Sequence, residues 1–466
     1  MSIQERADIA EYAVAFADKL GFDYCDAFVE GVTGRSYAVE QGKLNGSSYY
    51  EKAGIRIRLV KGRRLLTFST NKFEKAAIAS IISGYRGFNG VDTVFSGEKA
   101  QRAKYKVGER KRLADADVLA DLLSLDKTLA KRKYIKFRSV YAGVGKSDTF
   151  FVNSDGSRIE SSLPSAQAFA SIIVGGGKET RQRSMQFGGI GGYELLDPEK
   201  LEEKVLDEAK ALLNVIENGM RLSQHELRDV RNVVIAPEIS GIAVHESIGH
   251  PSEADRVFLR EAAQAGTSYL TKDNLGLEIG SPVVTIMDDP TIPNSNGFYL
   301  YDDDGVKAGP RTLVRDGVQD ELLMNRAYAH FLGKKSNASS RSDYYSNEPL
   351  VRMANTYLKP GNATLDELIS EACDGVYIKS FMEWNIDDTR SFSRYQGSEA
   401  YVIKNHRLGK PVKNYQLETK TIDFWHAVRL VSNEFELFLG NCGKGEPMQG
   451  VPVAMGGASA LLSFGR

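Results

Sequence analysis

Two histidines and a glutamate stand close together near the middle of the sequence, at His245, Glu246 and His250 in "VHESIGHP". A neutral imidazole is a common zinc ligand, and a glutamate beside such a ligand is a candidate general base for a metal-activated water. The zinc-protease signature His-Glu-x-x-His spaces its histidines four residues apart, on one face of a helix. Here the two histidines are five residues apart, so a metal site would need a different local geometry.

That spacing requires a deformed helix. Successive residues of a regular α-helix are about 100° apart, so His245 and His250 would point about 140° away from each other and could not hold one ion. Gly249 and Pro251 supply a cause for deformation, because glycine tolerates the left-handed backbone and proline disfavours a helical residue before it. We expect the helix to unwind at Gly249, or to contain one wide turn, so that both imidazoles face the same side.

A catalytic zinc ion needs a third protein ligand and one open position. Glu253 and Asp255 follow closely behind the motif, and Cys442 lies between glycines in "FLGNCGKGEP". Spacing alone leaves all three open as the third ligand. The segment Asp302–Gly305 is an acidic run that ends in a glycine, a pattern that favours a structural turn near the site over a cation site.

The elements that must position these residues indicate an α+β protein in two parts, an N-terminal α+β domain (1–222) and a C-terminal domain (223–466) that carries the candidate metal site. After a first amphipathic helix, the segment 25–70 alternates strand-like runs with glycine turns, which predicts an antiparallel meander. Helix, meander and helix then follow in the same order again, which suggests a duplicated unit. Residues 223–466 carry many short strand-like runs, and we expect a β-rich, barrel-like domain in which a helix bears the motif.

Composition narrows the class of protein. Of 466 residues, 42% are hydrophobic, and the formal net charge is −1, whereas a nucleic-acid-binding surface would favour a basic excess. We therefore expect no nucleic-acid partner. The sequence contains no apolar run of about 18 residues, so we expect no membrane-spanning helix. Charges interrupt the apolar residues of the N-terminal segment, unlike a signal peptide. Three scattered cysteines favour a reducing compartment, and we expect the cytoplasm.

Four sequence blocks resemble the TldD branch of the TldD/PmbA family of metallopeptidases. Two of them are "HESIGHPSEAD" and "LGNCGKGEPMQGVPVAMGG", and the other two lie at residues 301–317 and 349–369, in the same order as in the family. The matching blocks span residues 244–457. The N-terminal half resembles the family only in the order of its elements.

The resemblance implies one zinc ion held by His245, His250 and Cys442, with Glu246 as the general base that activates the zinc-bound water for attack on a peptide carbonyl. It also implies a PmbA-like (TldE) partner subunit that lacks the ligands, in a heterodimer whose chamber admits unfolded peptides, with a homodimer as the other possibility. Activities implied are the trimming of leader peptides and the degradation of small unstable proteins.

The leading hypothesis is therefore a zinc-dependent peptidase of the His-Glu-x-x-x-His type that hydrolyses unfolded or small peptides. The alternative is a non-catalytic binding or scaffold subunit with a structural metal. In that case a fourth protein ligand, such as Glu253 or Asp255, would complete the coordination of the metal. A third and weaker hypothesis is a modulator that acts on a DNA-handling enzyme through protein contacts.

Overall fold

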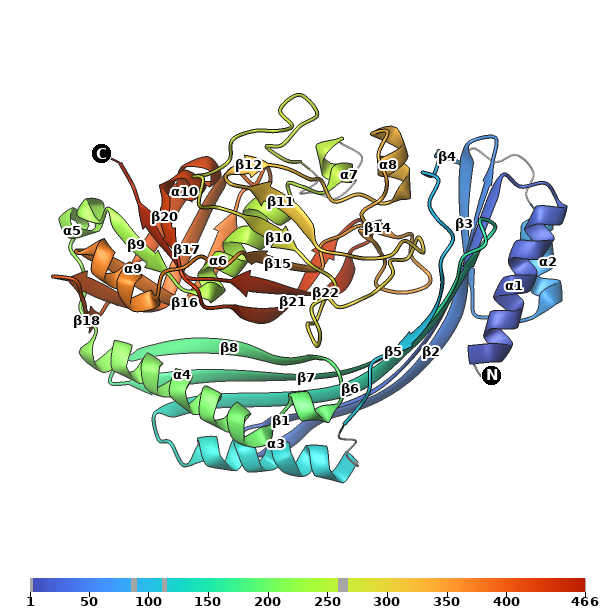
Figure 1. The fold of residues 1–466 in the computed structure, drawn as a ribbon. Coiled ribbons are helices and arrows are strands. Elements are labelled where there is room, and N and C mark those ends of the chain that lie inside the picture. The colour runs from blue at the N-terminus through green and yellow to red at the C-terminus, as the bar shows by residue number, and fades with distance from the viewer. Residues whose placement is uncertain (1–2, 85–89, 111–114, 259–266, 466) are drawn as a thin grey trace.

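A computed structural model describes residues 3–84, 90–110, 115–258 and 267–465. A long curved sheet built by the N-terminal half carries helices on its outer face, and the C-terminal half lies against its inner face (Figure 1). The predicted α+β class and the antiparallel N-terminal meander are confirmed.

The curved sheet has eight strands among the described residues. They are β1 (Tyr24–Glu40), β2 (Lys43–Lys61), β3 (Arg64–Thr70), β4 (Val91–Asp92), β5 (Arg102–Lys106), β6 (Ile135–Asn153), β7 (Arg158–Gly176) and β8 (Glu179–Ile190). Their order is β4-β3-β2-β1-β6-β7-β5, and β8 pairs with β7. At the centre β1 and β6 run antiparallel, from Asp26 opposite Asn153 to Glu40 opposite Ser139. The predicted repeated order of helix, meander and helix is present, and this pairing joins the two meanders into one sheet.

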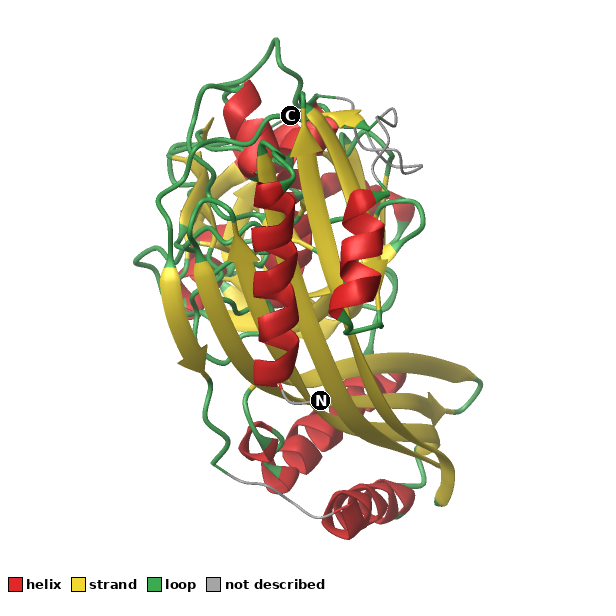
Figure 2. Ribbon diagram, turned by 90° about the vertical axis from the view of Figure 1, so that its right-hand side faces the viewer, coloured by secondary structure: helices red, strands yellow, loops and turns green. Residues whose placement is uncertain are grey.

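Four helices cover the outer face of this sheet (Figures 1 and 2). They are α1 (Ile3–Lys19), α2 (Lys75–Ser83), α3 (Asp115–Ala130) and α4 (Pro198–Asn218). The side chain of Asp197 caps α4 by accepting hydrogen bonds from the backbone N–H groups of Glu199 and Lys200, and Pro198 suits the first helical position because its missing N–H would have no partner there. These helices leave the inner face of the sheet to the C-terminal half.

The C-terminal half contains two larger sheets and one two-stranded ladder. The first sheet has the order β12 (Val318–Gln319), β11 (Arg311–Arg315), β10 (Ile286–Asp288), β15 (Asn355–Leu358), β22 (Gln449–Gly457) and β21 (Glu436–Lys444). The second has the order β18 (Arg407–Pro411), β17 (Phe392–Lys404), β16 (Gly375–Ile386), β9 (Asn232–Ile235), β23 (Ala460–Ser463) and β20 (Val428–Val431), with β19 (Gln416–Lys420) on β17. The ladder joins β13 (Ser340–Arg341) to β14 (Leu350–Val351). The half is β-rich as expected, and both strand orders are open rather than those of a closed barrel.

One apolar core fills the space between these two sheets and surrounds the helix that bears the motif. Thr364 and Glu367 form a capping box at the start of α9 (Leu365–Ala372), with reciprocal side-chain and backbone hydrogen bonds. No helix in the described ranges is long and apolar enough to cross a membrane. The helices of this half are α5 (Gln224–Asp229), α6 (Pro237–Val244), α7 (Ala254–Val257), α8 (Arg326–Phe331), α9 (Leu365–Ala372) and α10 (Thr421–Ala427).

Candidate metal centre

The His-Glu motif lies at the end of α6, a helix that is buried almost throughout. His245–Gly249 form a π-helical turn, in which the N–H of His250 donates to the carbonyl oxygen of His245 at 3.1 Å. A π turn includes one more residue than an α-helical turn, so residues five apart return to the same face. The expected wide turn is thus confirmed, and it accounts for the spacing of the two histidines.

The expected unwinding at Gly249 is wrong. Gly249 is not in the left-handed region, and His250 keeps helical angles, φ −59° and ψ −44°, although Pro251 follows it. Glycine is required here for steric reasons, because a Cβ at Gly249 would lie 2.0 Å from Sδ of Met353. Met353 is itself fully buried, so the π turn is packed tightly against its neighbours.

Polar contacts hold the π turn from behind. Pro251 has no N–H to offer the carbonyl of Ser247, and the hydroxyl of Tyr269 donates to that oxygen at 2.8 Å instead. The Ser247 hydroxyl donates to the carbonyl of Ala243 at 2.6 Å and accepts a hydrogen bond from the indole N–H of the fully buried Trp425 at 2.9 Å. The bond from Tyr269 satisfies a backbone carbonyl that a regular helix would have paired internally, and the other two pair buried side-chain groups.

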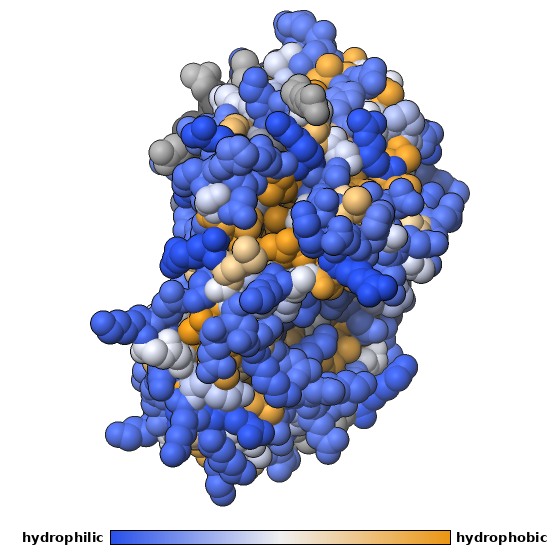
Figure 3. Space-filling model, turned by 90° about the vertical axis from the view of Figure 1, so that its left-hand side faces the viewer, coloured by the Kyte–Doolittle hydropathy of each residue, from blue (hydrophilic) through white to orange (hydrophobic). Residues whose placement is uncertain are grey.

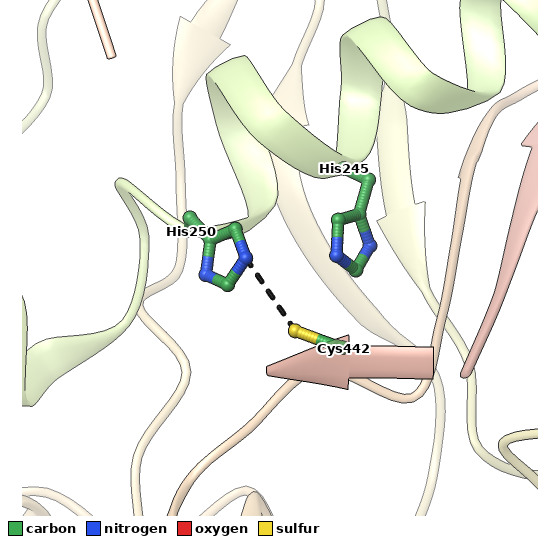
Figure 4. Close-up of side chains that lie close together, drawn as sticks. All are labelled: His245, His250 and Cys442. Atoms are coloured by element: carbon green, nitrogen blue, oxygen red, sulfur yellow. Dashed lines mark hydrogen bonds between the residues drawn. The ribbon is translucent and has the colours of Figure 1, made fainter. Parts of the chain in front are cut away.

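The two imidazoles face the thiol of Cys442 on β21 (Figure 4). One ligand atom from each of the three residues lies within 4.8 Å of the others, and Sγ of Cys442 is 3.4 Å from Nε2 of His250. Tetrahedral zinc with ligands at about 2.0–2.3 Å would set its ligand atoms roughly 3.3–3.6 Å apart. One pair already meets this spacing, and the most distant pair would need to approach by roughly 1.2–1.5 Å at most. Nδ1 of His245 is buried without a hydrogen-bond partner in the described part of the chain. No hydrogen bond therefore competes with a metal ion for this nitrogen.

The electrostatics favour the protonation state that a metal ion requires. Burial lowers the pKa of both His245 and His250, so the imidazoles are held neutral. Burial alone would raise the pKa of the Cys442 thiol, but His250 and the guanidinium of Arg352 outweigh it, and the pKa is lowered. Two imidazoles and a thiol whose pKa is lowered form a zinc-type donor set.

Glu253 and Asp255, the other two candidates for the third ligand, are engaged behind His250. Oε2 of Glu253 lies 3.0 Å from Nδ1 of His250, an arrangement that leaves Nε2 of that ring toward Cys442. Nζ of the fully buried Lys444 is 3.1 Å from Glu253 and 2.6 Å from Asp255. Burial alone would raise the pKa of Glu253, but Lys444 and His250 hold it well below its ordinary value. Carboxylates that orient a ligand imidazole in this way are common around metals.

Glu246 points its carboxylate to a partner that sequence reasoning missed. Nη1 of Arg390, in the loop between β16 and β17, donates to Oε2 of Glu246 in an ion pair, and both side chains are buried. The two residues are 144 positions apart, and no motif surrounds the arginine. Only the folded chain could show this pair.

The site opens into a cleft of about 1380 Å³ between the curved sheet and the C-terminal half. Segments of β8 and α4 line one side of the cleft, and α6, β16 and β21 line the other. Figure 3 shows apolar side chains gathered along the seam between the two halves on this face of the molecule. Typical small-molecule pockets are about 300–1,000 Å³, so the cleft is large enough for a longer ligand.

The acidic run Asp302–Gly305 forms the structural turn that was expected. Oδ1 of Asp302 accepts the backbone N–H of Asp304 at 3.1 Å. Asp304 in turn pairs with Arg58 of β2 at 2.8 Å, and Arg58 also pairs with Asp26 at 2.6 Å. The turn therefore ties the C-terminal half to the curved sheet instead of lining the cleft.

Three family models match the chain. They describe PmbA/TldA metallopeptidase domain 1, at residues 25–84, the central domain, at residues 109–213, and the C-terminal domain, at residues 229–463. The last match covers about half of the chain and contains the two histidines and Cys442. The chain belongs to the TldD/PmbA family of metallopeptidases. The resemblance seen in the sequence blocks is confirmed.

Similar proteins agree with this membership. A metalloprotease of Methanothermobacter thermautotrophicus is 33% identical over 321 residues, which cover 67% of this chain and 65% of that protein. A zinc metalloprotease TldD homolog of Saccharolobus solfataricus is 25% identical over 448 residues, which cover 95% of each chain.

Solved structures share the fold. A protein from Thermotoga maritima, described as a candidate modulator of a DNA gyrase, has a TM-score of 0.78 at 19% identity over 98% of both chains. TldE from Thermococcus kodakarensis has a TM-score of 0.75 at 16% identity, covering 98% of this chain and 99% of its own.

Proposed function

We propose that this member of the family is a zinc-dependent peptidase that hydrolyses unfolded or small peptides. The proposal is carried by one observation: His245, His250 and Cys442 gather their ligand atoms within 4.8 Å at the wall of a large cleft that Glu246 also lines. Zinc bound there would polarise a peptide carbonyl and lower the pKa of a water molecule.

The side chains of this chain have separate roles in the proposal. The two imidazoles and the Cys442 sulfur would hold the ion, and Glu253 fixes the orientation of the His250 ring through Nδ1. Glu246 accepts the proton of the attacking water and passes it to the nitrogen of the leaving amine, so that the proton is conserved over the reaction. The buried surroundings of the motif keep these groups in fixed positions.

The number of ligands favours catalysis over a purely structural ion. Among the described residues, one group of three is placed to hold a metal, and Glu253 and Asp255 are paired with Lys444 instead. A structural zinc site is normally closed by four protein ligands, whereas a catalytic site keeps one position open. Chelation tests this point: we expect the chelated protein to stay folded and become inactive, and global unfolding on chelation would support the scaffold alternative.

Two measurements test the site and the base. Elemental analysis should find about one zinc per chain in the wild type and loss of zinc in His250→Ala and Cys442→Ser. Glu246→Gln should keep the zinc and lose cleavage of unfolded casein. A Glu246→Gln variant that cleaves at the wild-type rate, or a His250→Ala variant that keeps its zinc, would refute the proposal.

We further propose a PmbA-like partner subunit. The likeness of the fold to TldE supports it, since the family was expected to pair a metal-bearing subunit with one of that kind. Digestion of unfolded casein by this chain with and without a PmbA-like protein tests the proposal. A rate that does not respond to the added protein, together with no complex in size-exclusion chromatography, would leave a homodimer as the alternative.

A further inference from the structure

The loop that carries Arg390 is a hydrogen-bonded turn between β16 and β17. Oδ1 of Asp387 accepts the backbone N–H groups of Ser391 and Phe392, each at 2.7 Å. The N–H of Arg390 donates to the carbonyl of Asp387 at 3.0 Å. Burial alone would raise the pKa of Asp387, but hydrogen bonds from Thr389 and from the loop backbone outweigh it and lower the pKa. The loop is thus built around the Asp387 carboxylate, which holds the backbone of Arg390 in place.

The backbone of Arg390 is itself strained. Its φ is +64°, in the left-handed region that residues other than glycine rarely adopt. The hydroxyl of Thr421, at the start of α10, donates to the carbonyl of Arg390 at 2.6 Å and holds it there. Strained residues persist where the surroundings impose their conformation, and they concentrate at functional sites.

The side chain of Arg390 reaches into the candidate metal centre. It is 9% exposed, it lines the cleft together with His245 and Cys442, and its Nη1 is bonded to Glu246. Its Nε is buried and has no hydrogen-bond partner within the described residues. A guanidinium has five N–H donors in a planar fork, and a buried donor left unpaired beside a cleft calls for an explanation. Glu246 engages one end of the guanidinium, at Nη1, and the side chain lines the cleft, so Arg390 has further donors beyond those that Glu246 uses.

We propose that Arg390 positions the Glu246 carboxylate and donates a hydrogen bond to the oxygen of the scissile peptide carbonyl. The inference rests on the proposed peptidase function. When the water oxygen bonds to the carbonyl carbon, the π electron pair of the C=O bond moves onto the carbonyl oxygen, and Glu246 takes the proton of the water. The pair returns as the C–N bond breaks, and the proton goes to the amine nitrogen.

A fixed guanidinium at the carbonyl oxygen stabilises the charge that develops there without losing a proton itself. Arginine suits this role better than lysine, because one edge of its fork can hold Glu246 while another donor meets the substrate. The same geometry gives Arg390 two functions in one turnover: it orients the Glu246 carboxylate, and it donates a hydrogen bond to the carbonyl oxygen of the substrate.

The test uses the zinc-loaded full chain and fluorogenic unfolded casein. Arg390→Ala should lower kcat by about 100–1,000-fold, as loss of one oxyanion donor does, with KM nearly unchanged and zinc content at the wild-type level. Millimolar guanidinium chloride should restore part of that rate, and an equal concentration of methylammonium should restore less. Arg394→Ala is the matched control: Arg394 lies four residues further on, half-exposed and paired with Glu383 outside the centre, and should cleave at the wild-type rate.

An Arg390→Ala variant that cleaves as fast as the wild type, or faster, would overturn the inference. The arginine would then either contribute nothing to catalysis or only inhibit Glu246 by pairing with it. A loss confined to KM would overturn it as well. If Arg390→Ala does not fold, Arg390→Lys decides: it keeps the charge without the fork, and an unchanged kcat would refute the role. The proposed function fails separately, when the wild type does not cleave or Glu246→Gln still does.

Discussion

Gly249→Ala gives the sharpest test of how the π turn is packed. Its backbone lies outside the left-handed region, so helix propensity alone would make alanine more stable than glycine by about 0.5–1 kcal/mol. The new Cβ, however, would stand 2.0 Å from Sδ of Met353, and overpacking of a filled core costs about 1–3 kcal/mol. Because Met353 is fully buried, we expect the clash to win, with a net destabilisation of about 1–2 kcal/mol.

A double-mutant cycle separates the two effects. In a Met353→Ala background the clash disappears, so Gly249→Ala should become neutral or slightly stabilising, with a coupling energy of about 2 kcal/mol. Urea unfolding of the chelated proteins, followed by tryptophan emission, measures this, because both tryptophans, Trp384 and Trp425, lie in the C-terminal half. Zinc affinity should fall in the single variant, since the clash displaces His250. Stabilisation by Gly249→Ala in the wild-type background would refute this account of the turn.

Three further predictions follow from buried charges and a helix cap. Lys444→Met removes the cation between two buried carboxylates, so urea unfolding should show a loss of about 3–5 kcal/mol, against less than about 0.5 for the exposed control Lys410→Met. Burial raises the pKa of Glu30 to about 7; the folded state then keeps a proton that the unfolded chain releases, so stability should fall as pH rises from about 4.5 to 7, by roughly 2–3 kcal/mol, and Glu30→Gln should flatten that slope. Thr364→Ala removes one half of the capping box of α9 and should cost about 1 kcal/mol in the same unfolding assay, whereas Thr364→Ser keeps the capping hydroxyl and should leave the stability nearly unchanged.

The site was predictable from sequence where a local rule was strong. The five-residue spacing of the histidines excluded a regular helix and required a wide turn, which the π-helical hydrogen bond of His250 supplies. The reason proposed for the turn was only partly right, because Gly249 is fixed by contact with Met353 and not by its own backbone freedom. A contact between residues about a hundred positions apart leaves no trace in local sequence.

The choice of the third candidate ligand shows the same limit. Spacing left Glu253, Asp255 and Cys442 equal, and the block resemblance pointed to Cys442. The structure brings the Cys442 thiol to the imidazoles and turns the two carboxylates toward Lys444. Cys442 and Lys444 lie two residues apart on β21, so the alternation of the strand turns both side chains to its buried face. There the thiol meets His250, and the ammonium group meets Glu253 and Asp255.

By itself, the sequence determined the family, the α+β class, the order of elements in the N-terminal half and the identity of the clustered motif residues, because these depend on neighbours along the chain. The tertiary structure alone decided the pairing of Glu246 with Arg390, the buried charges behind His250 and the cleft between the halves. Those features depend on side chains that sequence places far apart and that only the packing of the two sheets around α6 brings within bonding distance.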